Sequence, residues 1–146
     1  MARHDKEFPI ITEEESKTNT GKFLIADKIS EHIFKYSDLD AYRHVNTVRY
    51  VQLLMNQFSL EQHDSYFIRR MELSFLNEGK YGENLEILRH SFDINSENNS
   101  NLNDKDSGNE NKSRSYAFLL RTHSDHTPIL FSRIYLEKRT HQFIPN

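Results

Sequence analysis

One segment of this sequence, from about Val45 to about Phe58, has the apolar spacing of a helix of about four turns. Its apolar side chains form a wide stripe made of Val45, Val48, Tyr50, Val51, Leu53, Leu54, Met55 and Phe58. The polar residues between them are confined to a narrow strip. A helix that is apolar over most of its circumference is typical of a buried position. The rest of the chain must therefore form a layer that covers this helix.

The segments on both sides of this helix have the alternating pattern of β-strands. Alternation is clearest after the helix, where Met71, Leu73 and Phe75 are separated by polar residues. The predicted strands lie within residues 22–29, 32–36, 67–76, 85–94, 115–123 and 128–139. Short connections between successive strands favour an antiparallel sheet. We therefore predict a single α+β domain, in which an antiparallel sheet of about five strands, the last four in a meander, wraps around one long buried helix.

Two polar stretches are expected to lie outside the packed domain. Residues 1–21 are rich in acidic residues, Ser and Thr, and predict a polar tail or linker. Residues 95–115 contain seven Asn, five Ser and a single clearly apolar residue, Leu102. Because this stretch has too little apolar surface to offset the entropy of ordering it, we predict a disordered insertion at a hairpin tip. The domain then comprises residues 22–140, followed by a tail at 141–146.

Composition excludes several classes of function. The chain has no cysteine, which excludes disulfides, thiolate metal sites and a cysteine nucleophile, and favours a reducing cytoplasm. Its net charge of −3 does not favour non-specific binding to nucleic acid. No segment approaches the roughly 20 apolar residues of a membrane-spanning helix, and the first residues lack the apolar core of a signal peptide.

The stretch from His123 to His126 predicts a polar hairpin turn, because a metal site needs three or four convergent ligands. We expect neither a metal nor a cofactor.

The residues just ahead of the predicted helix are rich in groups that hydrogen-bond or transfer protons. Asp38, Asp40, His44 and Asn46 fall within nine residues. One interpretation is structural: the aspartates and the asparagine cap a turn or the helix, and the histidine is hydrogen-bonded. The other is functional: a buried helix would direct its N-terminal amides into the domain, where they polarise a carbonyl while a carboxylate and an imidazole activate a water. Spacing alone leaves both interpretations open.

The same segment resembles a known signature. Residues 37–56, SDLDAYRHVNTVRYVQLLMN, are similar to the D-x-D-x-N-x-H-V-N-N motif that precedes the central helix of hotdog-fold acyl-acyl carrier protein thioesterases. Residues 71–87, MELSFLNEGKYGENLEI, resemble a later motif of the bacterial enzymes, in which a glutamate and a glycine lie between two strands. The resemblance covers about residues 22–92. The family enzyme usually contains two hotdog repeats, and this chain resembles the second repeat with its preceding linker at residues 1–21.

The resemblance implies an enzyme of fatty acid biosynthesis that hydrolyses fatty acyl thioesters of acyl carrier protein or coenzyme A. It assigns catalytic roles to Asp40, His44 and Glu78. Asn46 matches a more structural position of the motif, beside the substrate. Tyr42 stands where the family has a catalytic asparagine. This departure keeps two alternatives open: a non-catalytic hotdog module that binds acyl chains or a partner protein, and an inactive half of a larger enzyme.

The resemblance also implies where the substrate and partners bind. The apolar face of the helix and sheet would hold the acyl tail. Arg43, Arg69, Arg70 and Lys80 would lie at a rim and contact an acidic carrier protein, with ordinary surface charge as the alternative. A domain of about 100 ordered residues is marginal alone, and an open sheet edge favours association. We therefore expect a homodimer, or pairing with another hotdog repeat.

Overall fold

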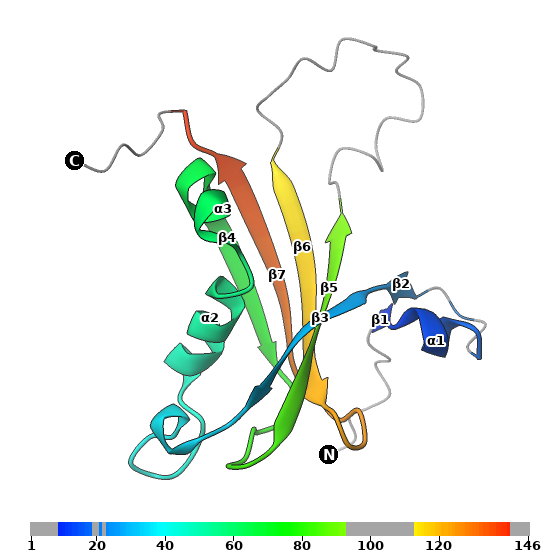
Figure 1. Ribbon diagram of the computed structural model, residues 1–146, viewed down its shortest axis with the longest axis vertical. Helices are drawn as coiled ribbons and strands as arrows, with labels where there is room; N and C mark the ends of the chain where they lie inside the picture. Colours follow the sequence, from blue (N-terminus) through cyan, green and yellow to red (C-terminus); the bar gives the residue numbers. More distant parts are fainter. Residues whose placement is uncertain (1–8, 19–20, 22, 93–112, 141–146) are drawn as a thin grey trace.

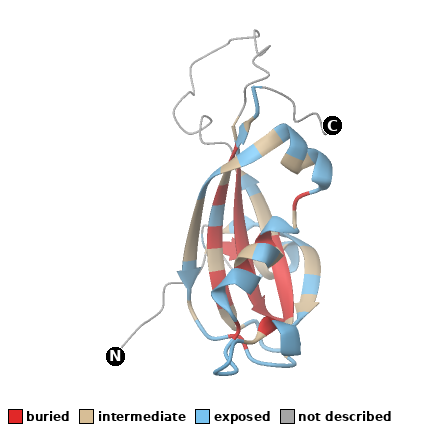
Figure 2. Cartoon of the chain, turned by 90° about the vertical axis from the view of Figure 1, so that its left-hand side faces the viewer, coloured by how far each residue is buried: buried red, intermediate tan, exposed pale blue. Residues whose placement is uncertain are grey.

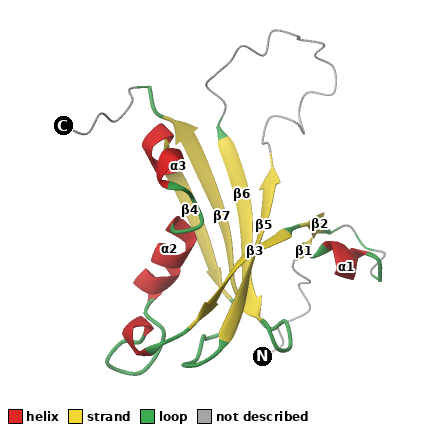
Figure 3. Ribbon diagram, viewed as in Figure 1, coloured by secondary structure: helices red, strands yellow, loops and turns green. Residues whose placement is uncertain are grey.

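The fold is that of a computed structural model, which describes residues 9–18, 21, 23–92 and 113–140. Five strands form one antiparallel sheet, with α2 and α3 along one side of it and α1 on the other (Figures 1 and 3). The sheet consists of β3 (Asp27–Ile33), β4 (Tyr66–Phe75), β5 (Asn84–Phe92), β6 (Arg114–Thr122) and β7 (Pro128–Lys138). The other elements are β1 (Ile10–Ile11), α1 (Glu13–Ser16), β2 (Leu24–Ile25), the 3-10 helix η1 (Tyr36–Asp38), α2 (Thr47–Met55) and α3 (Leu60–Ser65). The predicted α+β architecture with a five-stranded antiparallel sheet is confirmed.

The strand order differs from the predicted four-strand meander. The sheet runs β3-β5-β6-β7-β4, so β5, β6 and β7 form a meander, whereas β4 pairs with β7. The strand that follows the helices therefore lies at one edge of the sheet. The chain then crosses through residues 76–83 to the other side, where β5 pairs with β3. A connection that contains glycine can join two adjacent strands of a hairpin or two strands that are not adjacent in the sheet, so the local sequence did not distinguish these alternatives.

The central helix is shorter and less enclosed than predicted. α2 has nine residues, of which Tyr50 and Leu54 are buried, whereas Val48 is exposed. The helix does not continue through residue 58 because Ser59 starts a new one. The Ser59 hydroxyl accepts the amide of Gln62 and the Gln62 side chain accepts the amide of Ser59, which is a capping box at the start of α3. Within one chain, the apolar stripe is covered on its inner side only.

The main core lies between α2 and the sheet. Side chains from the helix and from β5, β6 and β7 meet there, and Phe34, Leu54, Leu85, Phe118 and Ile134 are among those almost fully buried. The buried segments run along the central strands (Figure 2). Burial of each large apolar side chain contributes about 1.5–3 kcal/mol to folding. This core holds the inner face of α2 in place, and with it the loop that precedes the helix.

Part of the predicted N-terminal tail packs on the opposite face of the sheet. Ile10 is buried among Leu88, Ala117 and Leu119. β1 pairs with β2 in parallel, and α1 follows β1 directly. Residues 9–18 therefore belong to the packed domain, which corrects the predicted domain start at residue 22. Buried isoleucine side chains stabilise this segment despite the polar residues around them.

A buried ionic cluster joins α1 to the sheet. Nε of Arg121 donates to the Glu86 carboxylate at 3.0 Å, and its Nη1 donates to Glu15 at 2.8 Å. The side chains of Arg121 and Glu86 are only 6% and 7% exposed. His123 contacts Glu86 at 2.9 Å, and His126 contacts Glu15 at 3.1 Å. The predicted polar turn at these histidines is confirmed, and it adds two imidazoles to the cluster.

The predicted boundary of the insertion at residue 115 is wrong. Arg114 and Ser115 are the first residues of β6, so they belong to the sheet. Ser113 is described and precedes the strand, whereas residues 95–112 of that prediction lie outside the described residues, as does the predicted tail at 141–146. In the part of the chain that the structure describes, no helix has the length and apolar character needed to cross a membrane.

Candidate active site

The residues between η1 and α2 form a tight loop. The backbone N–H of Asp40 donates to the carbonyl of His44 at 2.8 Å, and the N–H of Arg43 donates to the Asp40 carbonyl at 3.0 Å. On either side of these bonds, Leu39 and Val45 form an isolated β-bridge. The loop therefore has a defined shape, which presents the side chains of residues 40–44 at one end of the domain.

Asp38 and Asn46 anchor the two ends of this loop. The buried carboxylate of Asp38 accepts the amide of Lys35 at 2.8 Å and contacts Nε2 of His32 at 3.1 Å. Asn46 is the N-cap of α2, and its side chain accepts the amide of Val48 at 3.0 Å. The structural interpretation of the sequence therefore describes these two residues correctly.

The Asp40 carboxylate is turned towards its own loop. Its Oδ1 accepts the amides of Tyr42 at 2.9 Å and of His44 at 3.0 Å. Between these two residues, Arg43 has a φ of 64°, in the left-handed region that non-glycine residues seldom occupy. The two hydrogen bonds to Asp40 stabilise this backbone conformation. Asp40 therefore positions the backbone that carries His44.

His44 and Glu78 come together from distant parts of the sequence. Nδ1 of His44 lies 3.3 Å from Oε1 of Glu78, which is on the connection between β4 and β5. The two side chains are 63% and 57% exposed. A carboxylate beside an imidazole can accept a proton from water and pass it to the ring. The fold thus brings together two of the residues predicted to be catalytic, with Asp40 bonded to the backbone of His44.

The connection that carries Glu78 is anchored through its neighbour, Gly79. The Gly79 amide donates to the hydroxyl of Tyr50, on the inner face of α2, at 3.1 Å. A Cβ at Gly79 would lie 2.5 Å from that hydroxyl and would also overlap the ring of Phe34. Burial raises the pKa of the Tyr50 phenol, so the phenol stays protonated at neutral pH.

Sequence reasoning did not identify Tyr50 and Gly79 as supports of the site. The sequence feature that could have indicated this support was Tyr50 itself. A tyrosine on the buried face of a helix needs a hydrogen-bond partner for its hydroxyl. The identity of that partner depended on how the crossing after β4 packs against α2.

The start of α2 is at the surface, not inside the domain. Thr47 is exposed, the amide of Val48 is bound by the Asn46 side chain, and the amide of Arg49 donates to the Asn46 carbonyl at 2.9 Å. The prediction that a buried helix directs its amides towards a substrate is therefore wrong for the single chain, because the sheet covers only the inner face of α2. Tyr42, in the adjoining loop, is 82% exposed.

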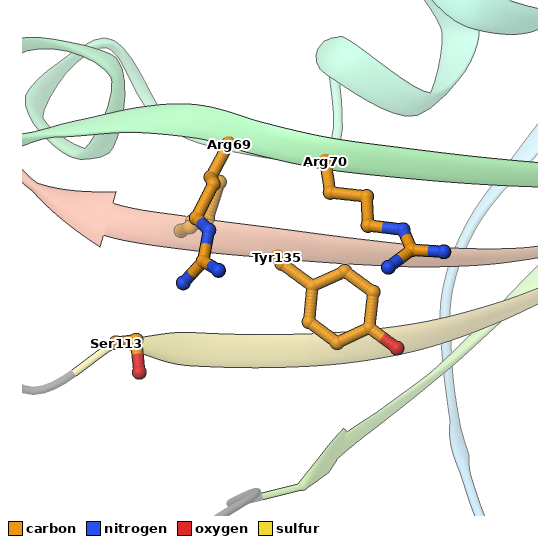
Figure 4. A pocket seen from close by; sticks show the side chains of 5 residues that line it. Arg69, Arg70, Ser113 and Tyr135 are labelled. Carbon is orange, nitrogen blue, oxygen red and sulfur yellow. The ribbon is translucent and has the colours of Figure 1, made fainter.

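The four basic residues predicted at a substrate rim fall into two groups. Arg43 belongs to the site loop, and Lys80 follows the Glu78–Gly79 connection. Arg69 and Arg70 lie on β4, five to six residues before the strand ends near the site, which is about 17–20 Å along the strand. They line a separate cavity (Figure 4). Among the described residues, no group of three or more His, Asp or Glu side chains could hold a metal ion.

Comparison with known protein families gives a match over most of the chain. The sequence profile of the acyl-ACP thioesterase C-terminal domain matches residues 21–119. The chain belongs to this family. The matched region of the domain includes both the loop of Asp40 and His44 and the connection that carries Glu78. A comparison with curated protein sequences gives no significant match.

Solved thioesterase structures share the fold of this domain. An acyl-ACP thioesterase from Bacteroides thetaiotaomicron is 22% identical over 76% of this chain and 37% of its own, with a TM-score of 0.56. A 1,4-dihydroxy-2-naphthoyl-CoA thioesterase from Synechocystis is 8% identical over 80% and 86%, with a TM-score of 0.58. A Thermus thermophilus thioesterase solved with coenzyme A and zinc is 12% identical over 80% and 90%, with a TM-score of 0.57. The predicted hotdog fold is confirmed, and the domain spans little more than a third of the Bacteroides enzyme.

Proposed function

We propose that this domain hydrolyses fatty acyl thioesters carried by acyl carrier protein or coenzyme A, as an acyl-ACP thioesterase. The observation that carries the proposal is the contact between His44 and Glu78, which the Gly79–Tyr50 hydrogen bond anchors beside the start of α2. Membership of the acyl-ACP thioesterase C-terminal domain family supports the reaction class. Fatty acid biosynthesis in the cytoplasm is the proposed setting, in keeping with a chain that has no cysteine.

In this proposal a water molecule attacks the thioester carbonyl carbon. Glu78 accepts a proton from the water as the new C–O bond forms, and the carbonyl oxygen becomes an oxyanion. When the intermediate collapses, the C–S bond breaks and protonated His44 gives its proton to the departing thiolate. The proton that Glu78 took from the water then passes to His44 across their 3.3 Å contact, which restores both groups to their starting protonation states. The products are a fatty acid and the free thiol of the carrier.

The other predicted site residues have supporting roles in this proposal. Asp40 holds the loop that carries His44, and Asn46 caps the helix that follows. The exposed apolar side chains of α2, Val48 and Met55, are proposed to contact the acyl tail. Arg43 and Lys80 flank the His44–Glu78 pair in the sequence and are proposed to face the carrier.

Tyr42 is the residue whose replacement is expected to raise activity. Its ring is 82% exposed, and it stands where the family has an asparagine, which offers both a donor and an acceptor on a short side chain. We expect Tyr42→Asn to increase the rate of thiol release from acyl-CoA by about 10²–10³-fold, because one contact to the oxyanion is typically worth that much in rate. Tyr42→Ala, which removes the ring without supplying an amide, is the control and should give little increase. A slower Tyr42→Asn variant would mean that the tyrosine hydroxyl itself takes part in the reaction.

We also propose that the domain pairs with a second copy through the edge strand β4. The His44–Glu78 pair is more than half exposed, so one chain does not exclude water from it. β4 has ten residues, lies at the sheet edge and exposes Phe67 and Phe75. An edge strand with exposed apolar side chains favours pairing with another strand, and two-fold pairing is the commonest way to close such an interface.

Sedimentation of the purified chain is expected to give a dimer at micromolar concentrations. Phe67→Lys places a charge on the edge strand and should shift the equilibrium to monomer. Ile25→Lys is the matched control, because Ile25 is also exposed but lies on β2, outside the five-stranded sheet. A parent protein that sediments only as monomer over this range would contradict the proposed pairing. Thiol release should decrease together with the dimer fraction.

A second candidate function, a non-catalytic module that binds acyl thioesters, is favoured by one observation. Tyr42 replaces the family's catalytic asparagine, which removes a side chain expected at the carbonyl. This function predicts saturable binding of an acyl-CoA with no thiol release from any chain length. Turnover that is lost in His44→Ala would exclude it.

A further inference from the structure

A β-bulge on β4 places two consecutive arginines on the same face of the sheet. Ile68 pairs with Leu136 and Arg70 pairs with Tyr135, so Arg69 is an extra residue between two successive pairs. Ile68 and Met71 both pack against the main core under α2. Because the residues on both sides of the bulge face the core, Arg69 and Arg70 face away from it. In Figure 4 both side chains extend from β4 across β7.

These arginines line a cavity of about 190 Å³ together with Ser113, Tyr135 and Leu136. In Figure 4 the ring of Tyr135 lies between the two guanidinium groups, and Ser113 lies at the start of β6. The volume is below the range of about 300–1,000 Å³ that is typical of sites for whole drug-sized ligands. The cavity therefore suits a small polar group, not an acyl tail.

The charge in this cavity is only partly neutralised. Arg70 pairs with Glu72 at 2.9 Å. Within the described residues, the guanidinium of Arg69 has no carboxylate partner within ion-pair distance. The hydroxyls of Tyr135 and Ser113 are further hydrogen-bond donors among the residues that line the cavity. Polar groups in excess of their partners mark a place where a ligand or water is expected.

We propose that Arg69, Arg70, Tyr135 and Ser113 form a binding site for a phosphate group. Two guanidinium groups on one face can donate paired hydrogen bonds to a tetrahedral oxyanion, which arginine matches better than lysine does. The site lies on the face of the sheet opposite the core and away from His44 and Glu78. It does not rest on the proposed reaction. Its ligand is a phosphate-bearing small molecule or phosphate itself.

The test is a titration of the full chain with inorganic phosphate, followed by amide chemical shifts at constant ionic strength. We expect saturable shifts centred on residues 69–70, 113 and 135. Arg69→Gln and Arg70→Gln should each weaken binding by about tenfold, as is typical for loss of a charged hydrogen bond. Glu72→Gln removes a competing carboxylate and should tighten binding. Arg49→Gln, the same change of charge on the exposed surface of α2, is the control and should have no effect.

Coenzyme A and pantetheine distinguish the source of the phosphate. Stronger binding of coenzyme A than of inorganic phosphate, lost in Arg69→Gln and not seen with pantetheine, identifies a cofactor phosphate as the ligand. Equal binding of coenzyme A and inorganic phosphate identifies the simple anion. The proposal is overturned if phosphate gives no saturable shifts, or if Arg69→Gln and Arg49→Gln bind phosphate equally. These measurements are independent of thiol release, so a chain that binds phosphate without turnover refutes only the proposed reaction.

Discussion

Glu78→Gln is expected to lower thiol release from acyl thioesters by about 10²–10⁴-fold, the usual contribution of a general base. Glutamine keeps the shape of the side chain but does not take a proton from water at neutral pH. The side chain is more than half exposed and makes its described contact with His44 only, so the fold should not change. The rate is measured as free thiol released per enzyme, with the circular dichroism spectrum as the check on folding.

Glu83→Gln is the matched control for this prediction. Glu83 lies on the same connection, and its carboxylate accepts the amide of Lys80 at 2.7 Å, a bond that glutamine can preserve. This variant should keep nearly parental activity. His44→Ala should lose activity to a similar degree as Glu78→Gln, and the double variant should lose little more, because two residues that act as a unit are not additive. Parental turnover in both single variants would mean that the loop of residues 38–46 is only a structural turn.

Arg121→Gln is expected to lower the free energy of unfolding by about 3–5 kcal/mol. Its guanidinium is the shared partner of Glu86 and Glu15, and the side chains of Arg121 and Glu86 are almost fully buried. Removing one member of a buried ion pair leaves the other charge without compensation, which is more costly than losing the pair as a whole. In a chain of this size the melting temperature should decrease by more than about 10 °C.

Two further variants test this explanation. Adding Glu86→Gln to Arg121→Gln should recover part of the lost stability, because the uncompensated buried charge is then removed. Arg49→Gln is the exposed control and should change the melting temperature little. If Arg121→Gln were as stable as the Arg49→Gln control, the cluster would not hold the N-terminal segment on the sheet.

The same cluster gives stability a dependence on acidic pH. Burial alone raises the pKa of Glu15, but hydrogen bonds from Thr12 and Arg121 outweigh it and leave the pKa below its ordinary value of 4.5. A carboxyl whose pKa is lowered by folding contributes stability above its unfolded pKa, and this contribution is lost as the pH falls through the folded pKa. The parent should therefore lose stability below about pH 4.5 more steeply than Arg121→Gln does.

The sequence by itself determined the fold class and pointed to three residues of the candidate site, Asp40, His44 and Glu78. Alternation along residues 67–76 and 128–139 predicted strands that are present as β4 and β7, because side-chain direction in a strand follows directly from spacing. The motif around Asp40 and His44, with Glu78 further on, identified residues that the fold brings together. Local hydrogen bonding could also be predicted from the sequence, because Asn46 caps the helix by accepting the amide of Val48, only two residues away.

Only the tertiary structure decided the arrangement of these parts. Strand order depends on which edges meet, so β4 beside β7 was not visible in local sequence. The length of α2 was set by competition between its apolar stripe and the capping box at Ser59. The burial of Ile10 on the sheet, and the hydrogen bond from Gly79 to Tyr50, join residues far apart in the chain. The exposure of the outer face of α2 was also not predictable from the sequence. The apolar spacing of a helix shows how much of its surface is apolar, whereas only the packing of the folded chain decides which element covers that surface.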